Sequence, residues 1–150
     1  VLSLTRQNLE PIRKKYSNVN KCSLGAYEVF RTNKKIHLTI IASGSEVNLA
    51  IETSHKLAKE KVYSKVISMP CQDLFDSQSR TYKQKILNET KMKISIEAAS
   101  TDSWKKYVGN EGLTFGIDTF GKSAPYKEIY KYFGLTAANI ANKSKKLINR

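Results

Sequence analysis

The chain has 150 residues, of which 40% are hydrophobic and 26% are charged, and its formal net charge is +13 at pH 7. This length suits one globular domain with a hydrophobic core, and the longest apolar runs are far too short to cross a membrane. The positive charge invites a nucleic-acid-binding role. However, Lys greatly outnumbers Arg, and the basic residues are scattered in pairs with acids between them. We therefore expect neither a nucleic-acid nor a membrane partner.

Cysteine and histidine usage argues against a metal site or a structural disulfide. Cys22 and Cys71 lie far apart, and His37 and His55 have no cysteine at ligand spacing. We expect free thiols, and the start of the chain lacks the pattern of a secretory signal, so we expect a cytoplasmic protein. The first residue is a valine that opens a short apolar run. We interpret the chain as a piece of a longer protein.

The first third of the chain predicts a linker followed by two strands. Residues 1–4 indicate the end of a strand, and residues 13–22 (RKKYSNVNKC) are polar and without periodicity, as in a linker. Residues 26–30 and 36–42 have the composition of strands. Because only a short turn separates them, we expect these two strands to form an antiparallel hairpin. The apolar run LTIIA in the second strand is typical of a strand covered on both faces.

The rest of the chain alternates between helices and strands. Residues 43–61 carry apolar side chains at helical spacing and predict a helix of about four turns. Strands are predicted at residues 62–69, 92–98 and 113–117, and helices at residues 82–87, 103–108, 125–133 and from Thr136 onward. This order predicts an α/β fold in which a mostly parallel sheet has helices on both faces and one antiparallel edge strand.

The turn Ser43-Gly44-Ser45-Glu46 joins a predicted strand to a predicted helix, a place where open α/β sheets bind anions. It matches neither the dinucleotide motif nor the P-loop motif. Ser43 and Glu46 have the spacing of a capping box, and Gly44 would ease the turn. We therefore interpret the turn as a helix cap, with a regulatory anion site as the alternative.

Other polar and aromatic residues are expected to have structural roles. Ser123 is placed to cap the helix that begins near Pro125. Trp104 and Tyr107, three residues apart on a predicted helix, are expected to pack at the edge of the core. The following acids show no spacing that indicates a catalytic pair: Asp73, Asp76, Glu97, Asp102 and Asp118.

Arg6 is the strongest candidate for a ligand contact. It lies at the end of the first predicted strand, beside Thr5, Gln7 and Asn8. Its planar guanidinium can donate two charge-assisted hydrogen bonds to a phosphate. A salt bridge to a neighbouring domain explains its position equally well, so the residues alone leave both roles open.

Six segments together resemble the C-terminal part of transketolase. No single segment is specific, but their order and spacing over nearly the whole chain are. In chain order they are SLTRQN, ASGSEV, VISMPCQDLFD, SIEAAS, WKKYVG and TFGKSAP.

The resemblance implies a fold, a domain division and partners. Residues 1–22 would be the end of the pyrimidine-binding domain and a linker, and residues 23–150 would be the transketolase C-terminal domain. That domain would be a Rossmann-like three-layer α/β/α unit with a five-stranded, mostly parallel sheet and one antiparallel strand. The whole enzyme would be a homodimer that uses thiamine diphosphate and a divalent cation (Mg²⁺ or Ca²⁺), none of it bound by this piece.

The resemblance also gives Arg6 a role and this piece a function. In the family, the arginine of the corresponding motif contacts the phosphate of the sugar substrate, and Arg6 matches that position. The enzyme transfers a two-carbon ketol unit from a ketose phosphate to an aldose phosphate. This piece would carry no catalytic residue and would be inactive alone, giving structural and dimer support. The alternatives are another thiamine-diphosphate enzyme (dihydroxyacetone synthase or deoxyxylulose-phosphate synthase) or a free-standing basic module that binds anions or nucleic acid.

Overall fold

The computed structural model describes residues 5, 7–13 and 15–148, so the predicted strand end at residues 1–4 and Arg6 lie outside the described residues. A five-stranded sheet in the order β1-β3-β2-β4-β5 forms the centre of the molecule. Its strands are β1 (Tyr27–Arg31), β2 (Leu38–Ala42), β3 (Ser64–Ser68), β4 (Lys93–Ile96) and β5 (Leu113–Phe115). β1 pairs antiparallel with β3, and the other three pairings are parallel. The predicted α/β class with one antiparallel edge strand is confirmed.

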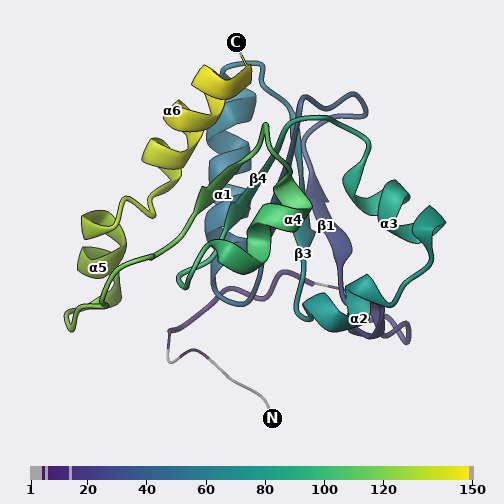
Figure 1. The fold of residues 1–150 in the computed structure, drawn as a ribbon, viewed down its shortest axis with the longest axis horizontal. Helices are drawn as coiled ribbons and strands as arrows, with labels where there is room; N and C mark the ends of the chain where they lie inside the picture. Colours follow the sequence, from purple (N-terminus) through teal and green to yellow (C-terminus); the bar gives the residue numbers. More distant parts are fainter. Residues whose placement is uncertain (1–4, 6, 14, 149–150) are drawn as a thin grey trace.

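Helices cover both faces of the sheet, which gives three layers (Figure 1). The helical segments are η1 (Lys21–Leu24), α1 (Glu46–Lys59), α2 (Gln72–Asp76), α3 (Arg80–Leu87), η2 (Asp102–Trp104), α4 (Lys105–Val108), α5 (Tyr126–Tyr132) and α6 (Ala137–Ile148). α1 and α6 lie side by side on one face, while α2, α3 and α4 supply the core of the other face.

Alternation along the strands divides the core between these two faces. In β2, Leu38, Ile40 and Ala42 pack under α1 and α6, whereas Ile41 joins the cluster under α2, α3 and α4. All five residues of β2 are buried, as the apolar run LTIIA predicts for a strand covered on both faces. The predicted stripe of α1 is also confirmed at Val47 and Leu57, both buried.

The expected hairpin between the first two strands is wrong, because β3 lies between β1 and β2. The connection that leaves β1 passes over the start of β3: Thr32 donates its backbone N–H to Ser64, and His37 donates to Tyr63. The residues between Arg31 and Leu38 are numerous enough to span two strand spacings, about 10 Å. β1 still runs antiparallel to its neighbour, but that neighbour is formed later in the chain.

Two short helical segments, η1 and α2, were not predicted. α2 lies within the segment that follows β3 and Pro70, where five residues are too few for a periodic pattern. The remaining predicted helices and strands are present with ends that differ by a few residues. Gly134 has a positive φ of 72° just after α5, the backbone conformation in which a glycine commonly ends a helix.

Candidate functional site

The carboxyl ends of the parallel strands meet at the edge of the sheet where α1 begins. Ser43 follows β2, and Glu97 follows the neighbouring strand β4. The connections through α1 and through α2 and α3 lie on opposite faces of the sheet, so this edge is the type of crevice in which α/β proteins bind ligands. A pocket of 220 Å³ lies there, with Gln72 and Trp104 also in its wall.

The predicted capping box at the start of α1 is not formed. The hydroxyl of Ser43 donates instead to the carboxylate of Glu97, at 2.6 Å. α1 begins after Ser45, which makes no side-chain capping bond. Gly44 does ease the turn, since its φ is +50°.

Two glutamate side chains near this turn weigh against the alternative role of anion binding. Burial raises the pKa of Glu97, and the nearby charge of Glu46 raises it further. A phosphate at the first turn of α1 would lie next to the side chains of Glu46 and Glu97, and Glu97 already accepts the hydrogen bond of the Ser43 hydroxyl. Negatively charged side chains near a site oppose the binding of an anion there.

Glu46 is the most buried acid at this edge, with 3% of its surface exposed. Its carboxylate accepts hydrogen bonds from the hydroxyl of Ser45 at 2.7 Å, from the backbone N–H of Ala98 at 3.3 Å and from the hydroxyl of Tyr130. Burial, together with the bond to Glu46, raises the pKa of Tyr130 to about 12. Glu46 thus joins the start of α1 to the end of β4 and to α5.

The N-terminal segment is attached to the same network. The side-chain amide of Gln7 donates to the hydroxyl of Tyr130 at 3.4 Å, and the backbone N–H of Gln7 donates to the hydroxyl of Thr5 at 3.2 Å. Farther along, Asn48 of α1 donates to the carbonyl of Glu10 at 3.3 Å. Arg6, the predicted phosphate ligand, is outside the described residues but lies between Thr5 and Gln7 in the chain.

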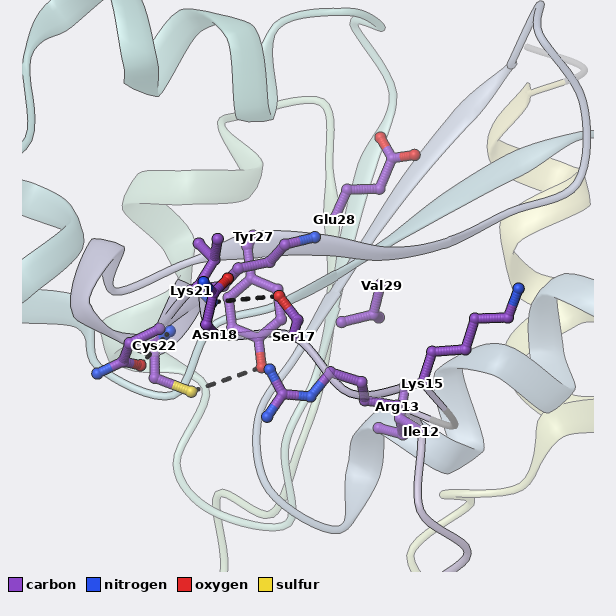
Figure 2. Close-up of a pocket in the computed structure, with 12 residues that line it drawn as sticks. Ile12, Arg13, Lys15, Ser17, Asn18, Lys21, Cys22, Tyr27, Glu28 and Val29 are labelled. Carbon is purple, nitrogen blue, oxygen red and sulfur yellow. Dashed lines mark hydrogen bonds between the residues drawn. The ribbon is translucent and has the colours of Figure 1, made fainter.

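A larger pocket, of 610 Å³, lies between the linker and β1 (Figure 2). The guanidinium of Arg13 points toward the hydroxyl of Tyr27, which lies 3.6 Å from the sulfur of Cys22. Lys15 and Glu28 point away from this group. Three basic residues, Arg13, Lys15 and Lys21, line this pocket, together with the carboxylate of Glu28 and the apolar side chains of Ile12 and Val29.

Most of the other predicted residues have structural partners. Trp104 and Tyr107 are buried and pack edge to face, with ring centroids 6.1 Å apart, which confirms their predicted role. Ser123 does not cap α5, whose N-terminal position is taken by Pro125 without a side-chain capping bond. Three of the other acids form separate contacts: Asp76 with Lys106 and Tyr107, Asp102 with Lys105, and Asp118 with Thr101.

Sequence reasoning missed the network of Glu46, Tyr130 and Gln7. Glu46 and Tyr130 are 84 residues apart, and Gln7 and Tyr130 are 123 apart, so no local spacing could have indicated it. Both cysteines are free thiols. Within the described ranges, no three His, Cys, Asp or Glu side chains come together as a metal site, and no helix is long and apolar enough to cross a membrane.

Comparison with known proteins gives consistent matches. A family model described as "Transketolase-like TK C-terminal domain" matches residues 25–136. The transketolase of Bacillus subtilis is 43% identical over 155 residues, which cover 99% of this chain and 23% of that protein.

Solved structures of transketolases also match this chain. A transketolase from Leishmania mexicana is 38% identical, with a TM-score of 0.78, and the match covers 86% of this chain and 18% of the Leishmania chain. A transketolase from Pichia stipitis in complex with sedoheptulose-7-phosphate is 33% identical with a TM-score of 0.77, with the same two coverages of 86% and 18%. This chain spans less than a quarter of the length of each of these relatives. By sequence and by fold, the chain belongs to the family of transketolase C-terminal domains.

Proposed function

We propose that this chain is the C-terminal part of a transketolase that transfers a two-carbon ketol unit from a ketose phosphate to an aldose phosphate. Family membership over most of the chain supports the assignment. The Pichia stipitis relative, solved with sedoheptulose-7-phosphate, supports sugar phosphates as the substrates. In this proposal the whole enzyme is a cytoplasmic homodimer, and the chain adjoins the upstream domains.

Within that enzyme the chain supplies structural and dimer support and one contact to the substrate phosphate, through Arg6. The observation that carries this role is the attachment of the neighbouring segment: Gln7 is bonded to Tyr130, and Glu10 to Asn48. The domain thus holds the residues that adjoin Arg6, and a guanidinium suits a phosphate because it donates two parallel hydrogen bonds.

The thiamine diphosphate and divalent cation of such an enzyme do not fit the described part of this chain. A divalent cation with a diphosphate needs carboxylate or carbonyl ligands gathered in one place, and the described residues offer no group of three acids, cysteines or histidines. In our proposal both are held by the upstream domains. The piece is therefore inactive alone.

The test is an Arg6→Ala substitution in the full-length enzyme. We expect the apparent affinity for a phosphorylated ketose donor to fall about ten- to a hundredfold, which corresponds to the ~1.5–3 kcal/mol of a charged hydrogen bond. An unphosphorylated ketol donor should be affected far less. Arg13→Ala is the matched control, because Arg13 belongs to the same N-terminal segment but points toward Tyr27.

Equal losses on both donors would refute the phosphate contact. Substrate profiling of the full-length enzyme decides between a transketolase and the related dihydroxyacetone and deoxyxylulose-phosphate synthases. Ketol transfer from a ketose phosphate to an aldose phosphate supports the proposal, whereas a preference for a different pair of substrates would assign the chain to one of the other two enzymes.

A further inference from the structure

Glu46 is a buried carboxylate that the structure satisfies with hydrogen-bond donors. Its 3% exposure would make an uncompensated charge costly. Three donors from three different places approach it: Ser45 beside it, Ala98 after β4 and Tyr130 on α5. Each donor is thereby held in a defined position relative to the sheet.

Tyr130 passes this constraint on to the N-terminal segment. Its hydroxyl proton is directed at Glu46, so its oxygen lone pairs remain for another donor, and the amide of Gln7 approaches from that side at 3.4 Å. A hydroxyl that donates to a carboxylate becomes a better acceptor, because hydrogen bonds in a chain polarise one another. The contact to Gln7 is long, but it continues a chain that ends on a buried charge.

A second attachment lies three residues farther along the segment. Asn48, in the first turn of α1, donates to the carbonyl of Glu10 at 3.3 Å. Between the two attachments, residues 7–10 form one wall of a groove whose other wall is made by α1, α5 and the start of α6. Residues 7–10 are therefore attached to the domain at both ends, through Gln7 and through Glu10.

We propose that Glu46 and Tyr130 are positioning residues, which hold Gln7 and so place the adjoining Arg6 for the substrate phosphate. This inference rests on the proposed function. Consecutive Cα atoms are about 3.8 Å apart, so fixing residue 7 restricts where the backbone of residue 6 can lie. Release of Gln7 would leave the guanidinium intact and would loosen its placement, which weakens a bidentate contact.

The experiment uses the full-length enzyme with Tyr130→Phe and, separately, Gln7→Met. Tyr130→Phe keeps the ring and removes the hydroxyl, while Gln7→Met keeps the length of a half-buried side chain outside the core and removes its donors. We expect each variant to raise KM for a phosphorylated ketose about three- to tenfold, the range of one neutral hydrogen bond. Values of kcat, and KM for an unphosphorylated ketol donor, should change by less than about twofold.

Tyr132→Phe is the control. Tyr132 lies on the same helix, is 64% exposed and makes no hydroxyl hydrogen bond with any described residue. A double-mutant cycle with Arg6→Ala gives the decisive readout: if Tyr130 acts through Arg6, its effect on KM should vanish once Arg6 is replaced.

The outcomes separate the two proposals. If Arg6→Ala shows no preference between phosphorylated and unphosphorylated donors, the proposed phosphate contact fails. Arg6→Ala could weaken phosphorylated donors selectively while Tyr130→Phe and Gln7→Met leave KM unchanged. That result would refute the positioning role of Glu46 and Tyr130, while the phosphate contact of Arg6 would stand. The positioning role is also refuted if Tyr130→Phe and Gln7→Met lower the melting temperature without changing KM, or raise KM equally for both donors. Either result is what a purely structural role produces.

Discussion

Removal of Glu89 should destabilise the domain because it leaves a buried ammonium without a partner. Lys65, on β3, is 1% exposed, and its Nζ lies 2.9 Å from a carboxylate oxygen of Glu89. Arg31 contacts the same carboxylate at 2.6 and 2.7 Å and also bonds to Glu28. In Glu89→Ala, Arg31 keeps one partner, whereas Lys65 loses the one carboxylate that it contacts among the described residues.

The magnitude follows from burial. Breaking a buried pair by removing one partner costs about 3–5 kcal/mol, but the Glu89 side chain is 35% exposed, so water will screen part of this and we expect about 2–3 kcal/mol. Glu28→Ala is the control, because it leaves Arg31 paired with Glu89 and should cost less than about 1 kcal/mol. Lys65→Met added to Glu89→Ala should restore most of the stability, since a buried apolar side chain needs no counter-ion.

Urea unfolding of the 150-residue chain measures these differences at pH 7. Arg31, and then Lys65, lower the pKa of Glu89 to about 2 from an ordinary value of 4.5. A lowered pKa means that this contribution is fully present above pH 4.5 and is lost as the pH falls toward 2. The difference in free energy of unfolding between the native chain and Glu89→Ala should therefore become smaller as the pH falls. A cost no larger than that of Glu28→Ala, or no rescue by Lys65→Met, would refute the reasoning.

Two further predictions concern the turn at Gly25 and the acid at Glu97. Gly25→Ala should lower the free energy of unfolding, measured in urea, by about 2–4 kcal/mol. The φ of Gly25 is +75°, which an alanine adopts only with strain, and an added Cβ would lie 2.1 Å from the backbone nitrogen of Phe75 in α2. Gly109→Ala, with the same φ in open space, should cost only about 1–2 kcal/mol, and equal costs would contradict the argument. NMR titration of the Glu97 carboxyl should give a pKa above its ordinary value, because burial disfavours the charged form. Stability from this group should therefore fall as the pH rises through that pKa, and Glu97→Gln should remove the slope; a pKa at or below the ordinary value would contradict this.

Local patterns predicted most elements and the mostly parallel sheet, but not the order of the strands within it. The run LTIIA was readable because a strand covered on both faces is apolar throughout. The stripe of α1 was readable because burial repeats at the helical period. The position of β1 was not, since the proximity of two strands in the chain favours a hairpin and the alternative depends on β3, which comes 33 residues after β1 ends at Arg31. α2 was missed because five residues carry no periodic signal.

The candidate site shows the same division. Ser43 and Glu46 have the spacing of a capping box, yet Ser43 bonds to Glu97, 54 residues away. A local cap competes with every other acceptor that the fold brings near, and only the packing of β2 against β4 places Glu97 within reach.

Residue patterns alone were enough to predict the α/β class, most of the elements and the resemblance to transketolase, because these depend on periodicity and on ordered motifs within short stretches of chain. The folded chain was needed to show that β1 lies against β3 and that Glu46, Tyr130 and Gln7 form one network. The physical reason is that a buried carboxylate must find donors wherever the fold supplies them, and here they come from segments up to 84 residues away.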